Sequence, residues 1–255
     1  MLRRDGATTA VVFSHPNHEL AIFGMLQSLR PSLVYLTDGG GERRVEETRA
    51  GLRSIGLAEH ACFLGYTEQS FYDALLERDA GFYADVAARV RDVLHELRPT
   101  QILCDSVEFY NPVHDMSLPI VRAALREEPA AEIFEVPLVH QTDGEEEAYR
   151  VQRPAPACGA VVEWPISSAE LDRKVEARDR IYTMLAAQMG PLLTELPRDA
   201  LAVEVVMPAA AELPEPGSDR VLRYERRARL LLERGDIERA ITYAGHWVPV
   251  ATSLF

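Results

Sequence analysis

Cysteine is scarce in this sequence of 255 residues, which contains three cysteines at widely spaced positions. The odd number and the spacing of Cys62, Cys104 and Cys158 exclude a disulfide framework and a paired-cysteine zinc motif. Cys62 and Cys104 lie within apolar runs that are typical of strands. We therefore predict that these two thiols are buried.

Excess positive charge and long apolar runs are also lacking. The net charge of -13 argues against a nucleic acid as the main partner, because affinity for nucleic acid rests on cations that neutralise phosphates. The most apolar window, 200–211, is interrupted by Glu204 and Pro208, so that nothing reaches the roughly 18 apolar residues of a membrane span. The apolar run at 8–13 is too short for a signal-peptide core. We expect a cytoplasmic protein that acts on a small molecule, as a monomer or a homo-oligomer.

Strand and helix patterns alternate through the first half of the chain. Such a βαβ series predicts an α/β fold, with a mainly parallel sheet flanked by helices. Ligands of such sheets bind at the carboxyl ends of the strands. Strands are predicted at 8–14, 32–37, 61–64, 101–105 and 133–140, and helices at 42–55, about 82–97 and 117–126.

The second half of the chain has a more mixed pattern. Ser167 and Glu170 resemble a capping box and predict the start of a helix there. Prolines within 191–220 indicate a surface excursion from a single domain that spans 1–255. The other predicted elements are edge strands at 145–150 and 160–164 and a last, charged helix at 224–234.

The first cluster of chemically competent residues is His15-Pro16-Asn17-His18-Glu19, directly after the first strand. Two histidines three residues apart, with a rigid proline between them, can turn both imidazoles toward one point. Histidine is the commonest neutral zinc ligand, and catalytic zinc usually has three protein ligands and one open position. The alternative is that these histidines are surface or helix-capping groups.

The second cluster, residues 105–115, also follows a strand and contains a histidine, a tyrosine and three acids. If the first strand lies beside the strand that ends at Asp105, His114 completes a three-histidine site with His15 and His18. The alternative is that 105–115 is a solvated loop.

These motifs resemble those of the LmbE-like or PIG-L superfamily, which contains N-acetylglucosaminyl-phosphatidylinositol de-N-acetylases and bacterial relatives. The family signature His-Pro-Asp-Asp-Glu corresponds to residues 15–19 here. Its third motif, His-Pro-Asp-His, corresponds to 111–114. Further matches are Thr-Asp-Gly at 37–39, Arg-x-x-Glu at 44–47, a Leu-Gly counterpart at 55–56, a late helix with a lysine at 171–174 and the tail 243–247.

The resemblance implies a Rossmann-like fold and a zinc site whose ligands are His15, His18 and His114. In the family, the first aspartate of the signature is the general base that deprotonates zinc-bound water for attack on an N-acetyl carbonyl. Its counterpart here is Asn17, and an amide cannot accept that proton. The first histidine of the third motif, which assists the transition state in the family, corresponds to Asn111.

Because these positions differ from the family pattern, the identity of the general base stays open. Three neutral histidines leave a metal its full charge, and such a site can bring bound water to a pKa of about 7, so that less help from a base is required. The nearby acids are Asp105, Glu108 and Glu19, although Glu19 and Asp38 can equally orient imidazoles or turns. The phenol of Tyr110 can donate to a developing oxyanion or simply pack its ring. Candidate substrate-binding residues are Asp38, Asn111 and His246.

We therefore expect a divergent hydrolase that uses zinc or another divalent metal to cleave an amide (N-acyl) bond of a small polar metabolite. One alternative is an enzyme of another reaction type that uses the metal as a Lewis acid. A second alternative is a ligand-binding homologue without catalytic activity. Metal content separates this second alternative from the enzymes, because an inactive homologue has no need to hold the ion tightly.

Overall fold

A mainly parallel sheet forms the centre of the computed structural model, which describes residues 2, 6–126, 131–141, 149–154, 159–216 and 221–255. The strand order is β3-β2-β1-β4-β5-β9-β8, in which the first five strands are parallel and the last two are antiparallel to their neighbours. The strands are β1 (Thr9–Phe13), β2 (Ser32–Thr37), β3 (Ala61–Tyr66), β4 (Gln101–Asp105), β5 (Glu132–Val136), β8 (Val162–Pro165) and β9 (Val203–Pro208).

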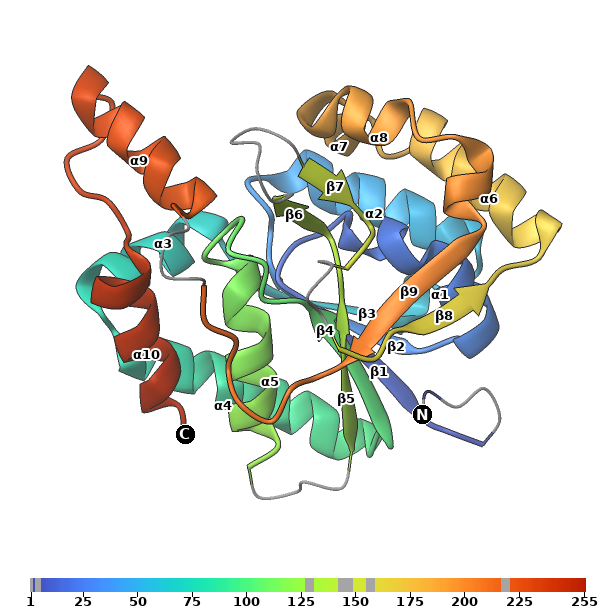
Figure 1. Ribbon diagram of the computed structural model, residues 1–255. Helices are drawn as coiled ribbons and strands as arrows, with labels where there is room; N and C mark the ends of the chain where they lie inside the picture. The colour runs from blue at the N-terminus through green and yellow to red at the C-terminus, as the bar shows by residue number, and fades with distance from the viewer. Residues whose placement is uncertain (1, 3–5, 127–130, 142–148, 155–158, 217–220) are drawn as a thin grey trace.

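Helices cover both faces of this sheet (Figure 1). The pleat of β1 directs Val12 into the apolar core of one face and Phe13 into that of the other, because successive strand residues point to opposite sides. One face is covered by α3 (Glu68–Glu77), α4 (Ala80–Leu97), α5 (Ser117–Ala124) and α10 (Val248–Ser253), and the other by α1 (Phe23–Leu29), α2 (Glu42–Ser54), α6 (Ser168–Arg180), α7 (Thr183–Met189) and α8 (Pro191–Thr194). The predicted α/β class, with a mainly parallel sheet flanked by helices, is confirmed.

The position of β1 between β2 and β4 determines where the two histidine motifs meet. β1 pairs with β2 on one side and with β4 on the other, all in parallel. The chain therefore leaves β1 and β4 at the same edge of the sheet, where the direction of strand succession reverses. Open α/β sheets bind ligands at such a switch point.

Two of the predicted elements are organised differently. The single strand expected at 133–140 is divided into β5 and β6 (Val139–Gln141), because Pro137 cannot continue the strand hydrogen bonds. β6 pairs with β7 (Tyr149–Val151) in a separate two-stranded sheet. Of the edge strand expected at 145–150, residues 145–148 lie outside the described residues.

Part of the segment 191–220 is a sheet strand and not a surface excursion. Val203–Pro208 forms β9, whose side chains from Glu204 to Met207 are buried between β5 and β8. Prolines surround this apolar run in the sequence and obscured it. The prediction that 1–255 is one domain stays a prediction.

Two further expectations are corrected by the structure. Cys62 is exposed, because β3 is an edge strand and this side chain is not covered, whereas Cys104 is buried as expected. The charged helix near the C-terminus is α9 (Arg223–Arg234), but it is followed by a π-helical turn, η5 (Tyr243–Trp247), and by α10.

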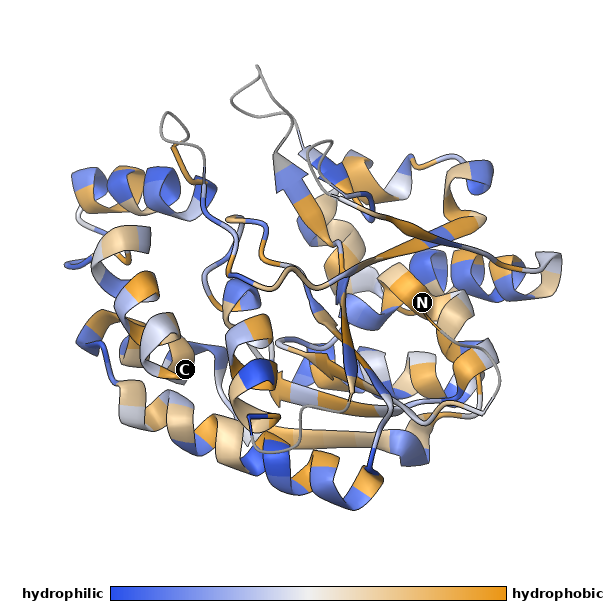
Figure 2. Cartoon of the chain, turned by 60° about the horizontal axis from the view of Figure 1, so that its bottom comes forward, coloured by the Kyte–Doolittle hydropathy of each residue, from blue (hydrophilic) through white to orange (hydrophobic). Residues whose placement is uncertain are grey.

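In Figure 2, hydrophobic colour predominates on the central strands, while hydrophilic and hydrophobic residues alternate along α9. None of the described helices combines the length and the apolar composition that crossing a membrane requires.

The capping box that begins α6 is confirmed, and one turn of this helix anchors the region of the first histidine motif. The ammonium group of Lys174, although buried, donates to the carboxylate of Glu204 on β9 (2.8 Å) and to the backbone carbonyl of Ala21 (2.9 Å). Burial lowers the pKa of Lys174, and Glu204 opposes this shift by favouring the charged form. This buried pair fixes the 3-10 helix η1 (His18–Ile22) against the sheet.

Candidate metal centre

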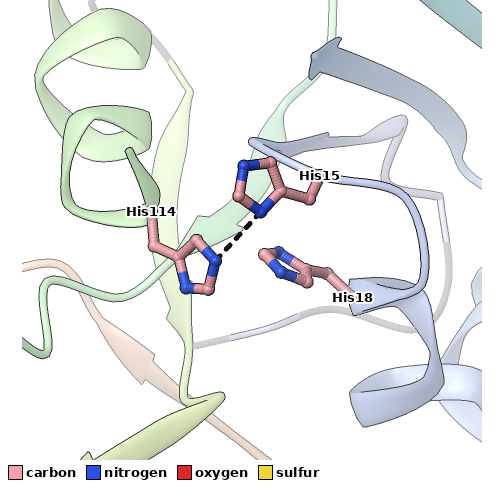
Figure 3. A group of neighbouring side chains, drawn as sticks. All are labelled: His15, His18 and His114. Atoms are coloured by element: carbon pink, nitrogen blue, oxygen red, sulfur yellow. Dashed lines mark hydrogen bonds between the residues drawn. The ribbon is translucent and has the colours of Figure 1, made fainter. Parts of the chain in front are cut away.

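Three buried histidines converge beyond the carboxyl ends of β1 and β4. His15 follows β1, His18 begins η1, and His114 begins the 3-10 helix η3 (His114–Met116). Each of them offers a ring nitrogen, and the three nitrogens lie within 4.8 Å of one another. Nε2 of His114 is 3.0 Å from Nδ1 of His15, and Figure 3 shows the three imidazoles facing one another. The predicted meeting of the two histidine motifs is therefore present.

The turn between the first two histidines depends on Asn17. Its backbone is left-handed (φ 79°), a conformation that asparagine tolerates better than most residues. Its N–H donates to Oγ1 of Thr48 (2.8 Å), and the Thr48 hydroxyl donates back to Oδ1 of Asn17 (3.0 Å). Nδ2 of Asn17 donates to Glu47 (3.2 Å). Helix α2 thus holds both the backbone and the amide of Asn17.

Asp105 orients His18 from the end of β4. Its Oδ1 lies 2.9 Å from Nδ1 of His18, while Oδ2 accepts the N–H of Ser14 (2.7 Å) and the hydroxyl of Ser117 (3.1 Å). The carboxylate is fully buried and each oxygen has a partner. A carboxylate on one ring nitrogen of a metal-binding histidine fixes the tautomer and leaves the other nitrogen free to coordinate.

Glu68 is the counterpart of Asp105 for His15, and sequence reasoning missed it. Its Oε1 lies 3.3 Å from Nε2 of His15 and accepts the hydroxyl of Tyr72 (3.0 Å). Glu68 begins α3 directly after β3, and its N–H donates to Asp38 (3.0 Å). The signal that pointed to His15 and Asp105, a polar residue just past the carboxyl end of a parallel strand, applies equally to Glu68.

The surroundings of these histidines favour binding of a metal ion. Burial, with His18 as a further cause, lowers the pKa of both His15 and His114 well below the usual range, so that both are neutral at pH 7. The nitrogens that converge are Nδ1 of His15 and Nε2 of His114, which lie 3.0 Å apart, while Nε2 of His15 faces Glu68. Buried imidazoles whose nitrogens meet at one point in this way fit a divalent ion such as zinc.

A pocket of about 590 Å³ opens above the three histidines. Asn17, Tyr110 and Asn111, all predicted site residues, line it together with His15, His18 and His114. The rings of Tyr110 and His114 are 6.3 Å apart, centre to centre. Among the described residues that line the pocket, Glu68 is the one carboxylate.

Asp105 and four other predicted site residues are not among the described residues that line the pocket. Asp38 shapes the turn after β2, since it accepts the N–H groups of Gly40 and Glu68 (both 3.0 Å). Nδ1 of His246 lies 3.1 Å from the backbone nitrogen of Thr242 in the C-terminal region. Neither is among the described residues of the pocket wall.

Glu108 and Glu19, the other two, are turned into the protein. The Glu108 carboxylate accepts the N–H groups of Leu138 (3.0 Å) and Val139 (2.7 Å), and burial raises its pKa well above the usual range. Glu19 is fully buried close to the phenol groups of Tyr35 and Tyr182, and burial raises its pKa as well. These contacts favour structural roles for both acids.

Comparison with solved structures finds similar folds, two of the three that follow being those of deacetylases. An A40926 pseudoaglycone deacetylase covers 82% of this chain and 100% of its own at 15% identity, with a TM-score of 0.56. A triple mutant of a deacetylase from the teicoplanin biosynthetic pathway covers 79% of this chain and 97% of its own at 12% identity, also with a TM-score of 0.56. The conserved protein TT1542 from Thermus thermophilus covers 84% and 100% at 20% identity, with a TM-score of 0.54.

Comparison by sequence finds no match, whereas comparison by structure finds several. No family model matches the chain, and no curated protein matches it at a significant level. At identities of 10 to 20%, the structural matches show the fold alone. They agree with the family resemblance of the motifs, and this chain shares the α/β fold of these solved structures.

Proposed function

We propose that this protein is a hydrolase that depends on a divalent metal, most simply zinc, and cleaves the amide (N-acyl) bond of a small polar molecule. The observation that supports this proposal most directly is the convergence of three buried histidines on one point in the wall of a pocket. A divalent ion in such a site polarises a carbonyl group and makes water more acidic. Similarity to deacetylases in fold supports the same class of reaction.

The ligands in this proposal are His15, His18 and His114, and Asp105 positions His18. Asp105 is not assigned as the general base, because both its oxygens are engaged in the protein interior. Proton acceptance from the attacking water is assigned to Glu68, the carboxylate in the pocket wall. This assignment explains how the site can function with an amide at Asn17.

Tyr110 and Asn111 contact the acyl carbonyl in the proposed complex. Burial raises the pKa of the half-buried Tyr110, so that its phenol stays protonated and can donate to a developing negative charge. Oδ1 of Asn111 accepts the N–H of Val113 (2.8 Å), which leaves its Nδ2 group available as a donor. Both side chains line the pocket beside His114.

The proposal is tested by metal analysis and hydrolysis assays on the same preparations. Protein purified without chelator should contain about one zinc or similar ion per chain. His15→Ala, His18→Ala and His114→Ala should each lower metal content and activity, whereas His60→Ala, outside the pocket, should do neither. Activity is measured as release of carboxylic acid from N-acetylglucosamine derivatives and other small N-acyl compounds.

The outcomes distinguish the alternatives. Full metal content in all three variants would show that the ligands are wrong. Metal content that depends on the histidines without cleavage of any amide would favour a Lewis-acid enzyme of another reaction type. Wild-type protein that retains no metal and cleaves nothing would indicate a binding protein without catalytic activity.

A further inference from the structure

We propose that the pocket binds substrates whose amine portion carries an anionic group, a carboxylate or a phosphate, and that Arg223 and Arg227 of α9 recognise this group. The reaction of these substrates rests on the proposed function, whereas the anion-binding site does not depend on it. Both arginines line the pocket that contains the three histidines. They are four residues apart on one helix and therefore lie on the same side of it.

Arg223 is held in place by aromatic side chains. Its guanidinium carbon lies 3.9 Å from the ring centre of Tyr110 and 5.9 Å from that of Tyr149, and the two rings pack edge to face. Tyr110 in turn lies beside His114. A guanidinium stacked on an aromatic face keeps its edge N–H groups free and in a fixed plane, which suits bidentate binding of a carboxylate or a phosphate.

No acid within the described residues neutralises this pair of arginines. Two other cations of the protein have acidic partners: the buried Lys174 pairs with Glu204, and the exposed Arg239, which also lines the pocket, pairs with Glu77. Arg223 and Arg227 form no ion pair with any described residue. Two guanidinium groups that face one pocket without counter-ions are expected to attract an anion from solution.

The charge of the pocket wall contrasts with that of the whole chain. The protein carries a net charge of -13, yet arginines outnumber carboxylates in the described pocket wall, where Glu68 is the one acid. The side of the pocket formed by β6, β7 and α7 is largely apolar, with Val139, Val151 and Leu185. Figures 1 and 2 both place α9 across the fold from α7. An anionic group of a bound substrate is therefore expected at α9.

The binding experiment uses the full chain as purified and two simple probes, inorganic phosphate and succinate, titrated by calorimetry at low ionic strength. Variants are Arg223→Gln with Arg227→Gln, and Arg229→Gln as a matched control, because Arg229 is exposed on the same helix and does not line the pocket. The double variant should bind the preferred probe about tenfold or more weakly, since charge-assisted hydrogen bonds are lost. The control should bind it as the wild type does.

The titration is repeated after dialysis against a chelator. Removal of metal ions excludes binding of phosphate or succinate through a metal. Preference for phosphate or for succinate identifies the anionic group. Binding of neither probe to the dialysed wild type, or equal binding by the double variant with unchanged thermal stability, would overturn the inference. Arg223→Lys, which keeps the charge but loses the stacked plane, should give an intermediate affinity.

Activity is a second and separate readout. Among small N-acyl compounds, those with an anionic amine portion should show a higher kcat/KM than neutral analogues, and this preference should disappear in the double variant while cleavage of the neutral analogue persists. Loss of anion binding in the double variant, with no amide cleaved by the wild type, would refute the proposed function and leave the anion site standing. An unaltered substrate preference in the double variant would refute the anion site and leave the hydrolase standing.

Discussion

The side-chain amide of Asn17 donates to Oε2 of Glu47 across 3.2 Å at the pocket wall. Glu47 is itself fixed, because Oε1 accepts the hydroxyl of Thr183 (2.7 Å) and the N–H of Met184 (3.1 Å). Its carboxylate cannot turn away from position 17 without losing these bonds. The amide at Asn17 therefore matches its surroundings as a hydrogen-bond donor, which an aspartate could not be.

Asn17→Asp, the change that restores the family residue, should destabilise the protein. It replaces a buried donor with a second carboxylate facing Glu47, and we expect a loss of about 1–3 kcal/mol in the free energy of unfolding near neutral pH. Adding Glu47→Gln supplies a donor and should recover most of this loss. Urea unfolding of wild type, both single variants and the double variant measures the effect. An Asn17→Asp protein as stable as the wild type would contradict the argument.

Asp105→Asn should weaken metal binding more than it weakens the fold. The amide cannot accept from His18 and from the Ser14 N–H and Ser117 hydroxyl together, so that the imidazole loses its fixed orientation. Loss of such a partner usually lowers metal affinity about 10–100-fold. Zinc titration against a competing chelating dye measures this change. Ser117→Ala, which removes one bond to Asp105 but leaves His18 untouched, serves as the control and should bind zinc nearly as tightly as the wild type.

Stability of the metal-free protein should fall as the solution is acidified through the range where free histidine titrates. Burial lowers the pKa of His15 and His114 below the 6.5 of an unfolded histidine, so that the unfolded state binds more protons than the folded state at pH values below about 6.5. The stabilisation is thus fully present above pH 6.5 and declines on the acid side, by up to about 1.4 kcal/mol per pH unit for each group.

Urea unfolding between pH 5 and pH 8 in the presence of a chelator tests this dependence. The variant His15→Gln with His114→Gln removes both titrating groups and should show a shallower decline than the wild type. Buried acids such as Glu19 and Glu108 contribute equally to both proteins and cancel in the comparison. Parallel curves for the two proteins would show that these histidines do not titrate as argued.

The sequence predicted the histidine site because the relevant information is local. β1, β2 and β4 are short apolar runs, and the polar residues that follow β1 and β4 belong to the same edge of a parallel sheet. β9 was missed because its role depends on antiparallel pairing with β5, which lies far away in the sequence and does not alter the local pattern.

Whether an individual acidic side chain points into the pocket or into the protein could not be predicted in this way. Glu19 and Glu108 lie within the two histidine motifs, yet both turn away from the pocket toward buried partners that the fold supplies. Glu68 belongs to neither motif and enters the pocket because β3 ends beside β2 at the same edge of the sheet. Position at the end of a strand predicted the cluster of histidines, whereas position within a motif did not predict where the acids point.

Glu68→Gln separates the two roles that its position allows. As a proton acceptor, Glu68 is expected to contribute about 10²–10⁴-fold to the rate, and its loss should remove the acidic limb of the pH–rate profile while zinc content stays unchanged. As a partner of His15 alone, 3.3 Å away, its loss should weaken zinc binding and leave the shape of the profile intact. Asp73→Asn, an exposed acid on the same helix, is the matched control and should alter neither quantity.

The profiles are recorded with each variant saturated in zinc, on whichever N-acyl compound the wild type cleaves fastest. A retained acidic limb in Glu68→Gln would show that Glu68 is not the base, and zinc affinity measured on the same protein would then report how far Glu68 supports His15.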